Sequence, residues 1–156
     1  MKKVFLTLVV LVTALFVSAS ASSGQGKAKT GPDPSTIRDS ELEKDSLHNL
    51  EVARHYFKLK KAYVAAIKRC EEIDAGNPNF ARMDEVLYIA GVSSLRLAEN
   101  RGKQKTKEKT PEQLRLDARV YLSRLVADYP NSGFYKQAEI DLQALGGPIK
   151  LEGSKP

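Results

Sequence analysis

The sequence contains little cysteine and none of the common catalytic motifs, which excludes several classes of protein. Among 156 residues there is one cysteine, Cys70, which excludes a disulfide-stapled domain and a four-cysteine zinc site. There is no Gly-rich phosphate loop, no Gly-x-Ser-x-Gly and no His-Glu-x-x-His. Adjacent acidic pairs such as Asp84-Glu85 point in different directions on a helix, so we expect solvent-facing charges there. The sequence therefore predicts no catalytic residues, no cofactor and no metal.

Long hydrophobic runs are also missing. The longest, residues 4–17, has 14 residues, whereas a membrane-spanning helix needs about 20. Two lysines precede it, and the small-x-small pattern Ala-Ser-Ala at 19–21 follows. These features are typical of a signal peptide, which we place at residues 1–21. We therefore expect an exported protein of the periplasm, with association to the outer membrane as an extension of that expectation. The alternative is a short membrane anchor that stays uncleaved.

Most of the remaining sequence has helical periodicity, and no segment has the alternation typical of strands. Residues 22–34 carry no large apolar side chain, so we predict a flexible linker over 22–39. Apolar residues then recur every three or four positions in five stretches separated by Gly, Pro and Asn. The prediction is an all-α domain of about five helices over residues 40–147, followed by a loose tail at 148–156.

Local signals predict several helix ends. Ser40 with Glu43 has the spacing of a capping box, in which each residue satisfies a free backbone N–H of the first turn. Thr110 with Gln113 has the same spacing and is followed by a proline, which suits the first helical position. Gly76, shortly before a proline, is typical of a glycine that ends a helix.

An internal repeat relates two pairs of helices. The second and fourth stretches match at an offset of 52 residues, and the first and third match at an offset of 37. Two helical hairpins with loops that differ by 15 residues explain both offsets, and small residues in each helix let the backbones approach. The prediction is a short solenoid of stacked helical hairpins. A bundle of four or five helices with chance matches is the alternative. The matched residues are Ala66, Cys70, Ile73 and Pro78 with Ala118, Leu122, Leu125 and Pro130, and Leu50 and Ala53 with Leu87 and Ala90.

The repeat pattern resembles the tetratricopeptide repeat. The segments 63–70 (YVAAIKRC), 86–91 (VLYIAG) and 127–132 (ADYPNS) look like those of the BamD-like (YfiO) group of outer-membrane assembly lipoproteins. The resemblance covers about residues 40–145, and the chain lacks the lipid-bearing cysteine of that group. It implies a tetratricopeptide-like solenoid that acts as a non-enzymatic scaffold. The implied partner is a peptide or protein of the cell envelope.

The same resemblance, together with helical phase, nominates a binding groove. In such solenoids the first helix of each hairpin lines the concave face. Two of the nominated residues are histidines seven positions apart, which is not the i, i+4 spacing of a helical zinc pair, so we expect no metal site. The predicted partner-binding groove consists of His48, Glu51, His55, Lys58, Tyr88, Val92 and Arg96.

A basic loop separates the third and fourth stretches. Residues 101–109 carry five positive charges and one negative charge. The loop is either a solvated connector or a contact for an anionic envelope surface such as lipid headgroups. We expect no nucleic-acid partner, because the loop has no aromatic residue for base stacking and the predicted export removes the usual ligand. The predicted anionic-surface residues are Arg101, Lys103, Lys105, Lys107 and Lys109.

The lone cysteine bears on oligomeric state. We predict that Cys70 is buried as a small hydrophobic residue, and the alternative is an intermolecular disulfide. About three repeats are usually needed for a stable stack, so the terminal helices should act as caps. Pairing into a homo-oligomer is the alternative way to cover the ends.

Overall fold

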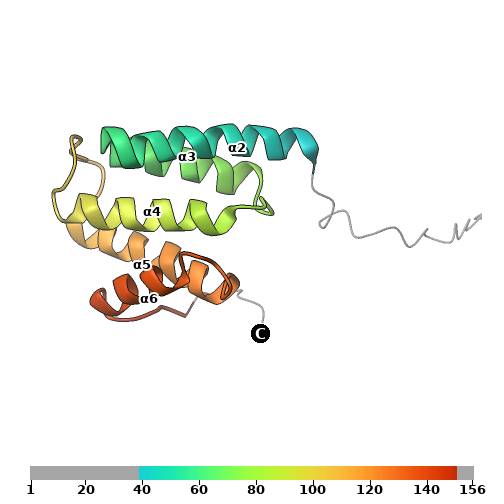
Figure 1. Cartoon of the computed structure of the whole chain (residues 1–156). Helices are drawn as coiled ribbons and strands as arrows, with labels where there is room; N and C mark the ends of the chain where they lie inside the picture. Colours follow the sequence, from blue (N-terminus) through green and yellow to red (C-terminus); the bar gives the residue numbers. More distant parts are fainter. Residues whose placement is uncertain (1–38, 151–156) are drawn as a thin grey trace, which may run out of the picture. The chain divides into compact units, whose positions relative to one another are not determined.

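The computed structural model describes residues 39–150, and every regular element in this part of the chain is helical (Figure 1). The all-α class and the five α-helices are therefore confirmed. None of these helices is long and apolar enough to span a membrane. The predicted signal peptide, the linker up to residue 38 and the last six residues of the tail lie outside the described residues. The elements are α2 (Ser40–Arg54), the π-helical turn η2 (His55–Lys60), α3 (Tyr63–Gly76), α4 (Met83–Ala98), α5 (Pro111–Asp128) and α6 (Tyr135–Ala144).

The two predicted capping boxes differ in outcome. The Thr110 box is confirmed, since its hydroxyl accepts from the Gln113 N–H at 3.3 Å and the Gln113 amide oxygen accepts from the Thr110 N–H at 2.8 Å. The Ser40 box is wrong, because Ser40 is already helical and Asp39 is the N-cap. The Asp39 carboxylate accepts from the Glu41 N–H at 2.9 Å, and aspartate caps a helix as well as serine does.

The predicted role of Gly76 is also wrong. Gly76 is the last residue of α3, and the N–H of Asn77 bonds to the carbonyl of Ile73 at 2.8 Å. Asn77 is buried, and its amide donates to the Ser46 hydroxyl at 3.2 Å. The end of α3 is therefore fixed by contact with α2, and no left-handed glycine is needed there.

The residues that the repeat relates are buried in both hairpins. All ten matched helical positions are at most 2 % exposed, whereas the two prolines are exposed. Small residues do bring the helices together. A Cβ on Gly91 of α4 would lie 2.7 Å from Cγ of Leu122 on α5, which is closer than real contacts allow. Burying each Leu or Ile of this set stabilises the fold by about 1.5–3 kcal/mol.

The two hairpins contact each other helix to helix. Arg54 of α2 binds Glu85 of α4, which joins the two first helices. Arg124 of α5 donates to both carboxylate oxygens of Asp74 on α3, each at 2.8 Å. This ion pair joins the second helices of the two hairpins. In Figure 1, α2 and α3 lie at the top, α4 lies below them, and α5 and α6 lie at the bottom. Each helix packs mainly against its neighbours in the chain.

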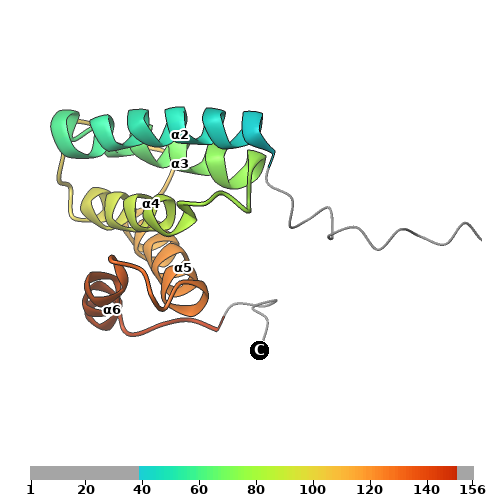
Figure 2. The same cartoon turned by 45° about the vertical axis from the view of Figure 1, so that its right-hand side comes forward.

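The residues after α6 return along α5 (Figure 2). Ile149 donates its N–H to the Ser123 hydroxyl at 3.0 Å, and Arg119 donates to the carbonyls of Gly147 and Gly146 at 3.0 and 3.3 Å. The sequence predicts a loose tail from residue 148 onwards. Of the tail residues that the structure describes, Ile149 is held through its backbone by Ser123, and Arg119 holds the two glycines that precede the tail.

Candidate functional site

The predicted groove residues of the first hairpin are exposed to solvent. His48, Glu51, His55 and Lys58 are all exposed on α2 and η2. Among the described residues, no three His, Cys, Asp or Glu side chains are arranged to hold a metal ion. This row therefore offers imidazole, carboxylate and ammonium groups to solvent or to a partner.

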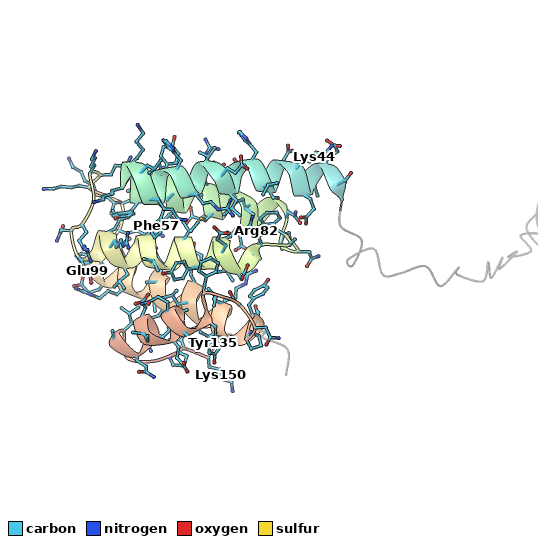
Figure 3. All side chains as sticks on the ribbon, viewed as in Figure 1. Lys44, Phe57, Arg82, Glu99, Tyr135 and Lys150 are labelled. Atoms are coloured by element: carbon cyan, nitrogen blue, oxygen red, sulfur yellow. The ribbon has the colours of Figure 1, made fainter. Side chains whose placement is uncertain are left out.

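The predicted groove residues of the second hairpin are largely engaged within the protein. Val92 is only 6 % exposed, because α4 is covered by helices on several sides. Arg96 donates to the Tyr63 hydroxyl at 3.0 Å, and its guanidinium lies 4.8 Å from the centre of the Phe57 ring. Figure 3 shows Phe57 in the space between η2 and α4. The structure therefore places Val92 and Arg96 in internal packing, which differs from their predicted role as partner contacts.

Tyr88 connects α4 to the start of α6. Its ring stacks on Phe134, with 4.7 Å between centroids and 20° between planes. Burial raises the pKa of the Tyr88 hydroxyl, the nearby Asp141 carboxylate raises it further, and Arg96 opposes the shift. One face of Tyr88 is thus occupied by Phe134, and the hydroxyl stays protonated at neutral pH.

A buried ion pair lies beside these residues, and sequence analysis missed it. Glu85 is 7 % exposed; its two oxygens accept from Nε and Nη2 of Arg54 at 2.5 and 2.6 Å, and Arg82 approaches at 3.1 Å. Burial raises the pKa of the Glu85 carboxyl, but the hydrogen bonds and charge of Arg54 and the charge of Arg82 outweigh burial, so the pKa lies below its ordinary value. The expectation that Glu85 faces solvent is wrong. The 31-residue separation from Arg54 leaves no local signal.

The basic loop is tied to the first hairpin at its beginning. Gly102 has a φ of 101°, and a Cβ there would lie 2.6 Å from the Tyr63 ring and 2.8 Å from the carbonyl of Lys61. The N–H of Lys103 donates to that same carbonyl at 3.1 Å. The Gln104 amide oxygen accepts from the N–H of Ala65 at 3.3 Å. Since α3 has no side-chain cap of its own, Gln104 supplies one from another hairpin.

The end of the loop is tied to α5. Lys109 donates to Asp117 at 2.7 Å, and this bond raises the pKa of the Lys109 ammonium. The hydroxyl of Thr106 accepts from the N–H of Glu108 at 3.2 Å. We call residues 100–109 the arch, because contacts anchor both of its ends. Figure 1 shows it beside the end of η2 and the start of α5. Residues 101–109 are exposed except Thr106, as expected of a solvated connector, and their contacts also give the loop a defined shape.

The five predicted cations of the arch divide into two groups. Lys109 is paired with Asp117, and Arg101 lies 3.4 Å from Glu99. Lys103, Lys105 and Lys107 are exposed and form no ion pair within residues 39–150. Three of the five charges are thus available to an anion.

A cavity of about 240 Å³ lies under the arch. Leu97 and Leu114, which are nearly buried, supply an apolar lining together with Pro111. Lys103 and Lys105 also line it. A smaller cavity of about 60 Å³ shares Leu97 and Leu114 with it. Sequence reasoning had no signal for either hollow, because each depends on where the arch is anchored.

Cys70 is buried, as predicted. It is 1 % exposed in α3, and burial, helped by the nearby carboxylates of Glu71, Glu85 and Asp74, raises the pKa of its thiol to about 12. The thiol is therefore protonated and shielded, and acts as a small hydrophobic side chain.

Comparison with known proteins gives no relative: no family model, no curated protein and no solved structure matches this chain. Two candidate sites therefore rest on geometry. One is the exposed row on α2 and η2, and the other is the arch with its cavity.

Proposed function

We propose that the chain is an exported, non-enzymatic interaction scaffold with a tetratricopeptide-like, BamD-like domain, which binds a peptide or protein partner in the cell envelope. The observation that carries the proposal is an apolar and polar row on α2 and η2. Of the five exposed large apolar side chains among the described residues, three belong to this segment: Leu42, Leu47 and Leu59. Helical phase places Leu47 and Leu59, but not Leu42, on the side of the exposed polar residues. Exposed apolar side chains rimmed by polar residues are typical of a contact surface.

The leucines are continuous with the predicted polar residues. Leu47 lies one helical turn before Glu51, and Leu59 lies four residues after His55, so the two leucines flank the polar residues along one side. Arg54 fixes the same segment to α4 through Glu85. A row held in place before binding loses little conformational entropy when a partner docks.

The test uses two exposed apolar residues in different places. Leu59, 71 % exposed, lies in the row, and Ile140, 59 % exposed, lies on α6. A partner is captured from envelope extract, purified and titrated against Leu59→Asp and Ile140→Asp. We expect Leu59→Asp to weaken binding more than about tenfold, since a buried apolar contact of this size contributes over 1.4 kcal/mol. Ile140→Asp should bind as the parent does. Equal affinity of the two variants would contradict the proposal.

A second candidate function is binding of an anionic envelope surface by the arch. It is favoured by three lysines that have no ion-pair partner among residues 39–150: Lys103, Lys105 and Lys107. Near an anionic membrane each contributes about 1 kcal/mol, and salt screens the attraction. Vesicles with and without phosphatidylglycerol provide the test. We expect binding that disappears at high salt and in the triple glutamine variant, whereas salt-insensitive binding would count against this candidate.

A further inference from the structure

We propose that the cavity under the arch is a binding site for a small amphipathic anion, a molecule with one acidic group and a short hydrocarbon part. The site is separate from the row on α2 and η2 and does not depend on the partner proposed there.

The cavity has room for a small organic molecule. Its volume is about 240 Å³. A cavity of roughly 150 Å³ holds benzene, so by proportion this one accommodates about ten non-hydrogen atoms. Leu97 and Leu114 are 7 % and 4 % exposed and present hydrocarbon to the interior of the cavity. Such a lining binds the apolar part of a ligand and gives little to a purely polar ion.

The charge around the cavity has one sign. Lys103 and Lys105 line it, and neither has an ion-pair partner among the described residues. None of the described residues lining this cavity is acidic, and the carboxylates of Glu71, Glu108 and Asp117 line only the smaller cavity beside it. An anionic headgroup would therefore meet two uncompensated ammonium groups.

The third unpaired lysine gives an internal comparison. Lys107 belongs to the same arch and is exposed, but it does not line the cavity. A diffuse basic surface would use all three lysines alike. A ligand held in the cavity contacts Lys103 and Lys105 but not Lys107.

The cavity is formed before any ligand arrives. The arch is anchored at Gly102 and Gln104 on the first hairpin and at Lys109 on α5. Binding then requires only the lysine side chains to become ordered, and the backbone contributes no further entropy cost.

The probes separate headgroup from tail. Octanoate carries a carboxylate and a chain of the right size, hexyl phosphate carries the other common acidic group, octan-1-ol lacks the charge, and acetate lacks the chain. Each is titrated into the full-length chain, with amide chemical shifts of residues 100–114 as the readout. We expect octanoate or hexyl phosphate to bind saturably and more than about tenfold tighter than octan-1-ol and acetate. The acid that binds better identifies the headgroup.

The lysine variants test the location. Lys103→Gln or Lys105→Gln should weaken binding about three- to fivefold, as expected for one partly exposed ion pair, while Lys107→Gln should leave it unchanged. Equal losses of affinity in all three variants would indicate binding to a diffuse basic surface and not to the cavity, and would overturn the proposal. Absence of saturable binding, or octanoate binding no tighter than acetate, would overturn it too. Leu59→Asp should not affect this titration, so failure here and failure of the scaffold proposal are distinguishable.

Discussion

The two hairpins bury equivalent residues but close in different ways. Two residues, Lys61 and Ala62, connect η2 to α3, and Lys61 adopts a left-handed conformation with φ of 52°. Twelve residues, 99–110, connect α4 to α5. The short turn bonds to its own helix, since Ala62 donates to the carbonyl of Tyr56 at 3.0 Å. The long loop bonds to the other hairpin. The buried residues therefore determine how the two helices of each hairpin pair. The loop between α4 and α5 is not needed for that pairing and can serve another purpose.

The same contrast holds at one pair of equivalent helix positions. Arg54 in the first hairpin and Gly91 in the second are related by the offset of 37 residues. Arg54 reaches out to Glu85 of the next hairpin, whereas Gly91 lets Leu122 approach within its own hairpin. One hairpin uses this position to join its neighbour, and the other uses it to close on itself.

Glu85→Gln breaks one of the two ion pairs that join the hairpins within residues 39–150 and should have the largest effect. Leaving Arg54 without its buried partner should lower the free energy of unfolding by roughly 3 kcal/mol. Urea denaturation measures it. The control is Glu72→Gln, whose partner Arg69 is half exposed, and a loss below about 1 kcal/mol is expected there. Similar losses in the two variants would contradict a special role for Glu85.

The pH dependence of the Glu85 link has a definite sign. Because the pKa of Glu85 is lowered in the folded protein, its contribution is complete above the ordinary carboxyl pKa and is lost as pH falls through the lowered value. Glu85→Gln should therefore reduce the loss of stability on acidification. A parent and variant with parallel stability profiles in acid would refute this.

Gly102→Ala tests the anchor of the arch on the first hairpin. A Cβ at φ of 101° is strained and collides with a backbone carbonyl, so we expect a loss of about 2 kcal/mol. Gly133→Ala is the control, since nothing lies within 4 Å of its Cβ and its φ is not positive. Thermal unfolding compares the two. An equally mild effect at both glycines would mean that the anchor is dispensable.

Gln104→Ala tests the cap that one hairpin provides for the other. Removing the acceptor of the Ala65 N–H should cost about 1 kcal/mol and speed hydrogen exchange in the first turn of α3. Thr110→Ala should cost a similar amount but speed exchange in the first turn of α5. Exchange measured residue by residue separates the two patterns, and unchanged protection at Ala65 in Gln104→Ala would show that the cap contributes nothing.

Ser93→Ala is the one variant that should stabilise the protein. The Ser93 hydroxyl is buried and has no hydrogen-bond partner among the described residues, so its removal should raise stability by about 1 kcal/mol. Ser94→Ala is the control next to it, because the Ser94 hydroxyl donates to the Ala90 carbonyl at 2.9 Å. The urea midpoint of each variant gives the comparison. A destabilised Ser93→Ala would indicate a missed partner.

The parts of the fold that depend on local sequence could be predicted. Helical periodicity gave five helices, the repeat offsets identified the buried positions, and Thr110 with Gln113 marked the start of α5. Contacts between segments distant in sequence could not be predicted. The Arg54–Glu85 pair, the cap from Gln104 and the cavity each require the stacking of two hairpins, and no spacing encodes them. The groove prediction was limited for the same reason, since Val92 and Arg96 face neighbours that only the fold provides.

The buried thiol gives the protein a built-in reporter. Cys70 is the only cysteine in the sequence and occupies, in the first hairpin, the position of Leu122 in the second. Since α3 packs against both α2 and α4, an alkylating reagent reaches Cys70 only when α3 separates from them. The rate of alkylation of the native chain therefore reports how often α3 separates from its neighbours α2 and α4, without any engineered label.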